Sequence, residues 1–162
     1  MSQSEDPIRY QSDLLLRIIK DKAGVELDYS LFSLFHLDKV LAQMFGKGMS
    51  RIPAEGMEDF KKALRFQIGC FYGECIRQAF SGIWEQDEQY GLCLKKVGGQ
   101  EVTIFPLSTA TERMSGDDSK LFAAASFVCR EVIKQISLNV YLPEEAPNTG
   151  ASERLTPPPL PK

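Results

Sequence analysis

Histidine is nearly missing from this sequence, because His36 is the only one in 162 residues. A metal site with two imidazole ligands is therefore excluded, and the four cysteines never form the C-x-x-C pair typical of zinc sites. We accordingly predict no metal and no cofactor. The cysteines lie inside apolar patterns, which favours buried thiols over two disulfides. They are Cys70, Cys75, Cys93 and Cys129.

Motifs for the common enzyme chemistries are missing too. The sequence has no G-x-S-x-G run, no phosphate-binding loop and no dinucleotide fingerprint. Residues 46–50, G-K-G-M-S, have suitable residue types for a phosphate loop, but they follow a predicted helix instead of opening one after a strand. A cysteine–histidine nucleophile would need His36 to meet one of four cysteines, and no spacing selects one. An enzyme is the less favoured interpretation, and the sequence leaves it open.

Long apolar runs and an excess of basic charge are also absent. No apolar stretch approaches the ~20 residues of a membrane span, and residues 1–6 are polar and acidic, unlike a signal peptide. The net charge is −3, and the densest basic group, Lys61, Lys62 and Arg65, is typical of a solvated helix face. We expect a cytoplasmic protein that binds neither nucleic acid nor a membrane.

The composition that is present, 43% hydrophobic and 25% charged, is that of a globular domain. We predict one α+β domain over residues 7–142, with a helical N-terminal half. Asp6 and Pro7 begin the first helix and Gly24 ends it, while Asp28 or Ser30 caps the second. The second helix has an apolar side of Leu31, Leu34, Leu37 and Leu41 and a polar side with Asp38 and Lys39.

Residues 60–80 predict a central helix that is buried on two sides. One apolar stripe contains Phe60 and Ile68, and the other contains Phe66. Gly69 and Gly73 lie one turn apart on the second stripe, where each costs about 1 kcal/mol of helix propensity against alanine. We therefore predict a structural role for both glycines, as a groove that a neighbouring backbone approaches. The expected neighbour is the final helix, through its alanines at 123–125.

Downstream of residue 82 the period changes from helical to two. Residues 83–87, 92–97 and 101–105 are predicted as three short strands of an antiparallel meander. A short helix follows over 107–114, and residues 115–118 are predicted to cap a closing helix. The apolar stripe of that helix contains Leu121, Ala124, Ala125, Val128, Val132 and Ile136. Residues 138–142 fit either a fourth strand or an anchor for the tail.

Four residues on and after the central helix are candidates for binding: Tyr72, Glu74, Arg77 and Trp84. Glu74 and Arg77 are three residues apart and hence neighbours on one helix face. One interpretation is an ion pair at an exposed edge. The other is a partly buried pair that holds the helix to the sheet or receives a polar ligand group. Trp84 is expected to pack on the core or the sheet more readily than to serve as a binding platform.

Residues 143–162 form a tail in which proline, polar and small residues dominate. Such a composition predicts disorder, because it cannot bury enough apolar surface to order itself. The run Pro157, Pro158, Pro159, Leu160 and Pro161 favours a polyproline II conformation. It is either a solvated terminus or a docking peptide for an aromatic groove on a protein partner.

The run G-C-F-Y-G-E-C-I-R at 69–77, followed by G-I-W-E-Q-D and G-Q-E-V-T-I-F-P, resembles a family of uncharacterised bacterial domains. Their common pattern is a G-x-[Y/F]-x-G-E-x-[L/I]-R helix, a G-x-W strand, and a strand that ends in phenylalanine beside proline. The resemblance covers roughly residues 10–135. It implies an α+β domain of unassigned activity and no catalytic residues.

Together these patterns favour a non-enzymatic cytoplasmic binding or accessory protein of bacterial origin. The alternative is a small-molecule sensor or enzyme with a pocket between sheet and helices, around Glu74, Arg77, Tyr72 and Trp84. A filled interior together with an exposed apolar patch would favour the binding protein. The sequence leaves the oligomeric state and the identity of any partner open.

Overall fold

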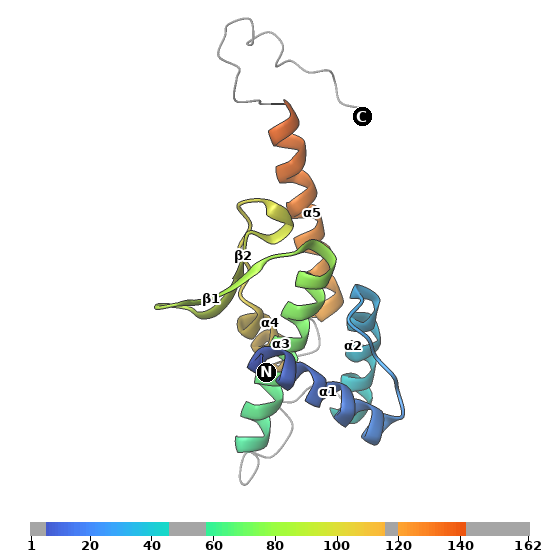
Figure 1. Cartoon of the computed structure of the whole chain (residues 1–162). Helices are drawn as coiled ribbons and strands as arrows, with labels where there is room; N and C mark the ends of the chain where they lie inside the picture. Colours follow the sequence, from blue (N-terminus) through green and yellow to red (C-terminus); the bar gives the residue numbers. More distant parts are fainter. Residues whose placement is uncertain (1–5, 46–57, 116–119, 142–162) are drawn as a thin grey trace, which may run out of the picture.

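The computed structural model describes residues 6–45, 58–115 and 120–141. In these ranges the order of elements is α1 (Pro7–Ala23), α2 (Leu31–Phe45), α3 (Glu58–Phe80), β1 (Ile83–Asp87), β2 (Gly91–Lys95), a 3-10 turn (Val97–Gly99), α4 (Pro106–Ser115) and α5 (Leu121–Tyr141). Figure 1 shows the helices gathered around α3 with the hairpin to one side. The predicted α+β class is confirmed. The tail predicted over 143–162 lies outside the described residues.

Local signals position the first two helices as predicted. The Asp6 carboxylate accepts hydrogen bonds from the N–H groups of Ile8 and Arg9, and Gly24 ends α1 at φ 69°, a left-handed conformation that suits glycine. At the start of α2, Asp28 and Ser30 both take part in the cap: the Ser30 hydroxyl accepts from the backbone N–H of Ser33, and Asp28 accepts from Ser30. Both proposed caps are thus used.

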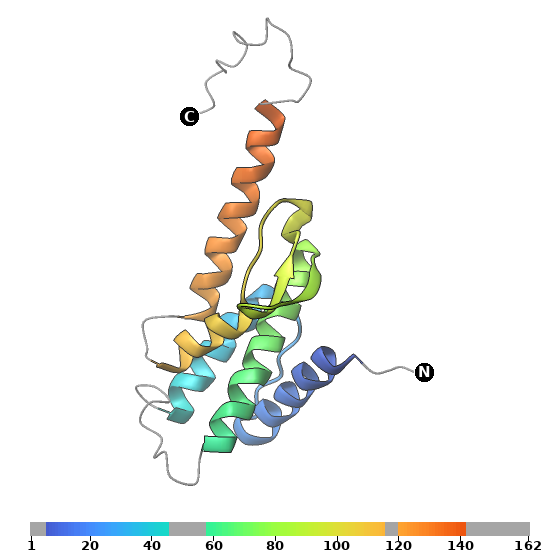
Figure 2. The ribbon, with the colours of Figure 1, turned by 90° about the vertical axis from the view of Figure 1, so that its left-hand side faces the viewer.

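The central position of α3 is confirmed for its second half. Every residue from Gln67 to Ile76 is buried, and Figure 2 shows this part of α3 running between α1 and α4. The first half differs from the prediction, because Phe60 and Phe66 are 42% and 36% exposed. Leu64 of the first stripe is nevertheless buried, so in this half only part of the apolar pattern reaches the core, which becomes continuous from Gln67 onward.

Helix α5 is longer than the body against which it packs (Figures 1 and 2). Leu121, Ala125, Val128 and Val132 are buried as predicted, whereas Ile136 is 44% exposed. Gly98 in the 3-10 turn lies against Val132, so this turn marks the level at which the body ends. Residues 138–141 continue α5, which excludes a fourth strand there. No helix in the described ranges is long and apolar enough to cross a membrane.

The predicted three-stranded meander is wrong in its third strand. β1 and β2 pair in antiparallel register, Trp84 opposite Leu94, but the segment 101–105 makes only one isolated bridge, between Ile104 and Leu94. Two backbone features explain this. Lys96 takes a left-handed conformation at φ 58° and turns the chain away from the strand direction, and Pro106 begins α4 directly afterwards. The segment between Lys96 and Pro106 therefore makes a single β-bridge and no third strand.

The glycine pair on α3 admits close neighbours, but they are not the alanines of α5. A Cβ built on Gly73 would lie 2.1 Å from Cη2 of Trp84 and 3.1 Å from Cγ of Pro106. A Cβ on Gly69 would lie 2.4 Å from Cδ2 of Leu107 and 3.2 Å from its Cα. The groove therefore receives the indole of β1 and the first turn of α4. The packing role is supported, and the predicted partner helix is corrected.

Gly73→Ala is expected to lower the free energy of unfolding by about 1–2 kcal/mol. Overpacking typically costs 1–3 kcal/mol, and the gain in helix propensity returns up to about 1 kcal/mol. Gly69→Ala should cost less, because Cδ2 of Leu107 ends a flexible side chain that can turn aside. Denaturant melts measure both effects. If either variant proved more stable than the parent, the close approach would be absent at that position.

Denaturant melts of double variants identify the group that a methyl group at position 73 meets. Gly73→Ala and Trp84→Leu should be non-additive, since the leucine removes the ring that the methyl group meets. Gly73→Ala and Ala124→Leu should add, because the atoms nearest to a Cβ on Gly73 belong to Trp84 and Pro106. The reverse pattern would restore α5 as the neighbour.

Candidate functional site

Glu74, the centre of the predicted site, is fully buried and accepts hydrogen bonds from three elements. Nε and Nη2 of Arg77 donate to its two carboxylate oxygens at 2.8 and 2.9 Å. Nε1 of Trp84 on β1 donates to Oε2 at 2.8 Å, and Nη1 of Arg9 on α1 donates to Oε1 at 3.3 Å. The carboxylate therefore joins α3 to β1 and to α1. Of the two interpretations of the Glu74–Arg77 pair, the structure has the partly buried one.

The charges around Glu74 favour its ionised form. Burial alone would raise the pKa of this carboxyl, but the hydrogen bonds from Arg77 and Trp84, with the charges of Arg77 and Arg9, lower the pKa below its ordinary value. Arg9 and Arg77 remain 40% and 38% exposed, so each guanidinium keeps part of its hydration. Arg9 also lies over the ring of Tyr29, 3.9 Å from its centroid.

Tyr72, the fourth predicted residue, does not join this group. It lies two positions from Glu74, which on a helix is the opposite side, and it is 1% exposed within the core. Burial raises the pKa of its hydroxyl. The structure thus brings together Glu74, Arg77 and Trp84, and it adds Arg9, which the sequence analysis missed. Nothing in the spacing points to Arg9, since 65 residues separate it from its partner.

The geometry around Glu74 is that of a structural support. Both carboxylate oxygens are occupied by donors, and the indole of Trp84 fills the space above Gly73. Two hollows on the described part of the surface are lined by other residues. A ligand group at Glu74 would have to displace hydrogen bonds that are already made at good distances.

Asp38 and Arg113 form a second buried ion pair, which the sequence pattern did not predict. The sequence places Asp38 on the polar side of α2, but its side chain is only 6% exposed. Oδ1 accepts from Nε of Arg113 at 2.8 Å and from the backbone N–H of Leu121 at 3.0 Å, and Oδ2 accepts from the N–H of Phe122 at 2.9 Å. Asp38 therefore caps α5 from another helix. The cap predicted at 115–118 falls largely outside the described residues.

The four cysteines are unpaired, as predicted. Cys70, Cys75 and Cys93 are buried and Cys129 is half-buried. Burial raises the pKa of Cys70 to about 12 and also raises the pKa of Cys75 and Cys93, so these three sulfurs stay protonated and poorly nucleophilic near neutral pH. No group of three potential metal ligands is found in the described ranges.

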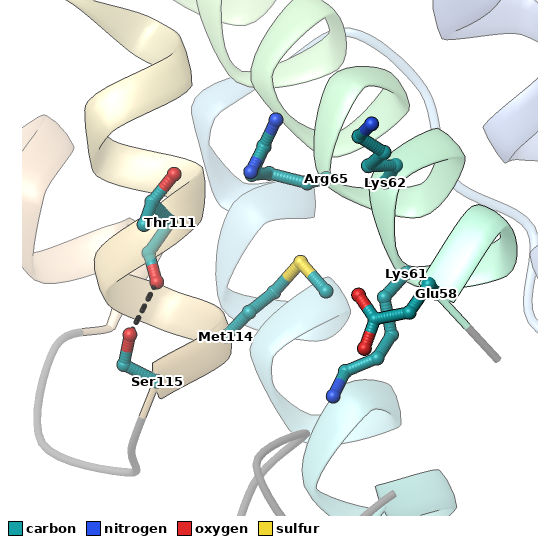
Figure 3. A pocket seen from close by; sticks show the side chains of 7 residues that line it. All are labelled: Glu58, Lys61, Lys62, Arg65, Thr111, Met114 and Ser115. Carbon is teal, nitrogen blue, oxygen red and sulfur yellow. Dashed lines mark hydrogen bonds between the residues drawn. The ribbon is translucent and has the colours of Figure 1, made fainter. Parts of the chain in front are cut away.

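A basic hollow of about 320 Å³ lies between the start of α3 and the end of α4. Figure 3 shows Met114 reaching from α4 toward the charged side chains of α3. The hydroxyl of Ser115 donates to the carbonyl oxygen of Thr111 at 2.8 Å, so it is already used. Lys62 is exposed and Lys61 and Arg65 are half-buried, so all three cations keep contact with solvent, as expected for a solvated helix face. The lining residues are Glu58, Lys61, Lys62, Arg65, Thr111, Met114 and Ser115.

A second hollow, of about 330 Å³, lies between α2 and α5. Beside it is a group of rings that we call the aromatic surface, in which Phe122 is half-buried and the other three are exposed: Phe32, Phe35, His36 and Phe122. The rings of Phe32 and Phe35 are stacked, with their centroids 5.4 Å apart. The ring of Phe122 lies edge-on to that of Phe35, with 5.7 Å between the centroids. Phe32 is 56% exposed and Phe35 is 36% exposed. The hollow is lined by Phe35, Asp38, Lys39, Ala42, Lys120, Phe122 and Ala123.

The helical period explains why these rings face outward. Leu34 and Leu37 point into the core and are fully buried. Phe32 and Phe35 are placed about 100–200° around the helix from these leucines, and so they face away from α3. The leucine stripe of α2 predicts only the buried side of the helix. The aromatics between the leucines were the available signal for this surface.

Comparison with protein-family models, with curated proteins and with solved structures found no match to this chain. The resemblance to a bacterial domain family therefore stays a prediction. The structure gives its motif a physical meaning: Gly69 and Gly73 admit α4 and Trp84, and Glu74 holds Arg77 and that same tryptophan. The residues of the motif thus form one packing unit.

Proposed function

We propose that this chain is a non-enzymatic protein-binding or accessory protein, and that its partner docks on the aromatic surface of α2 and α5. One observation carries the proposal. Phe32 and Phe35 lie stacked and exposed beside an apolar hollow. Burying such a side chain is worth roughly 1.5–3 kcal/mol, and aromatic residues are enriched where proteins meet. Clustered aromatic exposure of this kind is a feature of interaction sites.

The other predicted class, a small-molecule sensor or enzyme, has less support. Its pocket was expected around Glu74 and Arg77, where the carboxylate oxygens are hydrogen-bonded and the indole of Trp84 fills the groove. The three buried thiols are protonated near neutral pH and make poor nucleophiles. A cytoplasmic location and a bacterial origin are part of the same proposal and rest on the sequence.

A photo-crosslinking amino acid at position 32 tests the proposal in the native host. The aromatic probe replaces Phe32, and a control probe replaces Tyr10, which is equally exposed but lies on α1. We expect an adduct with one discrete protein from position 32 and not from position 10. The captured protein, once purified, should bind the unlabelled chain, and Phe35→Ser should weaken binding about tenfold or more. Equal adducts from both positions, or binding indifferent to Phe35→Ser, would refute it.

A further inference from the structure

We propose that the proline-rich segment 157–161 of this same chain binds the aromatic surface in polyproline II form, as an intramolecular competitor of the partner. The inference rests on the proposed function of that surface, since it names what occupies the surface when no partner is bound. Residues 142–162 lie outside the described part of the chain, and their sequence and length support the inference.

The chemistry of the proline-rich segment suits that of the aromatic surface. Proline-rich segments dock on grooves lined by aromatic rings, because the preformed polyproline II helix loses little conformational entropy on binding. The hollow offers Phe35 and Phe122 as walls. With three residues per turn, Pro158 and Pro161 share one edge of such a helix. The carbonyl groups of this helix carry no internal hydrogen bonds. Lys39 lines the hollow, with its ammonium 5.0 Å from the Phe35 ring centroid, and is a donor available to such carbonyl groups.

The length of the intervening chain permits the contact within one molecule. The hollow lies at the first turn of α5, at Phe122 and Ala123, and the tail leaves from the far end at Tyr141. Nineteen residues of helix span about 28 Å. The sixteen residues from 142 to 157 reach up to about 50 Å at 3.1 Å per residue. A linker longer than its span still gives a high effective concentration, so a weak contact suffices.

The contact would make the chain its own regulator. A partner that recognises the aromatic surface must displace the tail, so its apparent affinity is lowered by the fraction of molecules in which the tail is bound. Loss of the tail contact should therefore strengthen partner binding. The same segment, once displaced, is free for an aromatic groove elsewhere.

The test uses the purified full chain with the photo-crosslinking residue at position 32 and no other protein. We expect an adduct at the mass of the monomer, mapped to residues 156–162. Its yield should be constant over a roughly 100-fold range of protein concentration, because the effective concentration is set by the linker. Pro158→Ser with Pro161→Ser should lower the yield about tenfold, which corresponds to ~1.4 kcal/mol. The matched control is Pro143→Ser with Pro147→Ser, which removes two prolines from the linker instead. This control should not lower the yield of the adduct.

Three outcomes would overturn the inference: no adduct, a yield indifferent to the prolines at 158 and 161, or an adduct at the mass of a dimer. The dimer would assign the surface to a second copy. The partner experiment separates this failure from failure of the proposed function. If position 32 captures a partner in the host while the purified chain gives no internal adduct, only the inference about the tail is lost.

Discussion

Asp38→Ala is expected to lower the free energy of unfolding by about 3–5 kcal/mol, the range for removing one partner of a buried ion pair. The change removes the Asp38 carboxylate from the guanidinium of Arg113, itself 3% exposed, which keeps its hydrogen bond to the Asp38 carbonyl oxygen. It also leaves the N–H groups of Leu121 and Phe122 without acceptors at the start of α5. Caps of this kind alone are worth about 0.5–2 kcal/mol. Denaturant unfolding of the full chain measures the sum.

Two further variants separate the parts of this effect. Asp38→Asn keeps one oxygen acceptor but loses the charge, so it should fall between the parent and the alanine variant. Asp21→Ala removes an exposed carboxylate on α1 and should change stability by no more than about 0.5 kcal/mol. Hydrogen exchange at Leu121 and Phe122 should rise in both Asp38 variants. A loss below about 1 kcal/mol for Asp38→Ala would mean that α5 does not depend on this cap.

How far the fold followed from the sequence depended on the range of each interaction. The ends of α1 were predicted because Asp6 and Gly24 act within four residues of themselves. Asp38 was misplaced for the opposite reason. Its partner Arg113 lies 75 residues away, and helical periodicity alone assigns a charged residue beside lysine to solvent. A buried charge is not visible in a pattern until its partner is known.

The same reasoning explains the sheet and the glycine groove. An alternating pattern at 101–105 predicts a strand, but whether it pairs depends on the turn before it and on Pro106 after it. The glycines indicated that something approaches α3 closely, and small side chains on α5 were the only candidates that a rule of size supplied. The structure uses an indole and the first turn of α4 instead. Large groups fill a glycine groove as well as small ones do.

In the candidate sites too, contacts between residues close in sequence were predicted and contacts between distant ones were not. Glu74, Arg77 and Trp84 lie within ten residues of one another, on one helix face and the strand that follows. Their grouping could therefore be predicted from the sequence. The aromatic surface needs α2 and α5, whose residues 32 and 122 are far apart in the chain. Phe32, Phe35 and His36 form the local signal on α2, at spacings of three and four from Phe32. Their exposure depends on where the rest of the fold lies.

Glu74→Ala is expected to cost about 3 kcal/mol, the lower end of the range for a broken buried pair. The indole N–H of Trp84 would lose its acceptor, while Arg9 and Arg77, already partly exposed, can turn toward water. Glu74→Gln keeps the shape and one oxygen and should cost roughly half as much, since a hydrogen bond to a charged group exceeds a neutral one by about 1 kcal/mol. Glu85→Gln, on the exposed side of the hairpin, is the matched control and should be nearly neutral.

The pH dependence of these variants shows whether charge is the cause. The folded pKa of Glu74 lies below its ordinary value of 4.5, so the unfolded chain takes up the proton first as the pH falls. The stability that the carboxylate provides is therefore present above 4.5 and is lost as the pH falls through the folded pKa. The gap in unfolding free energy between the parent and Glu74→Gln should narrow from neutral pH toward roughly pH 3. A gap that stayed constant would mean that shape, and not the ion pair, holds α3 to α1 and β1.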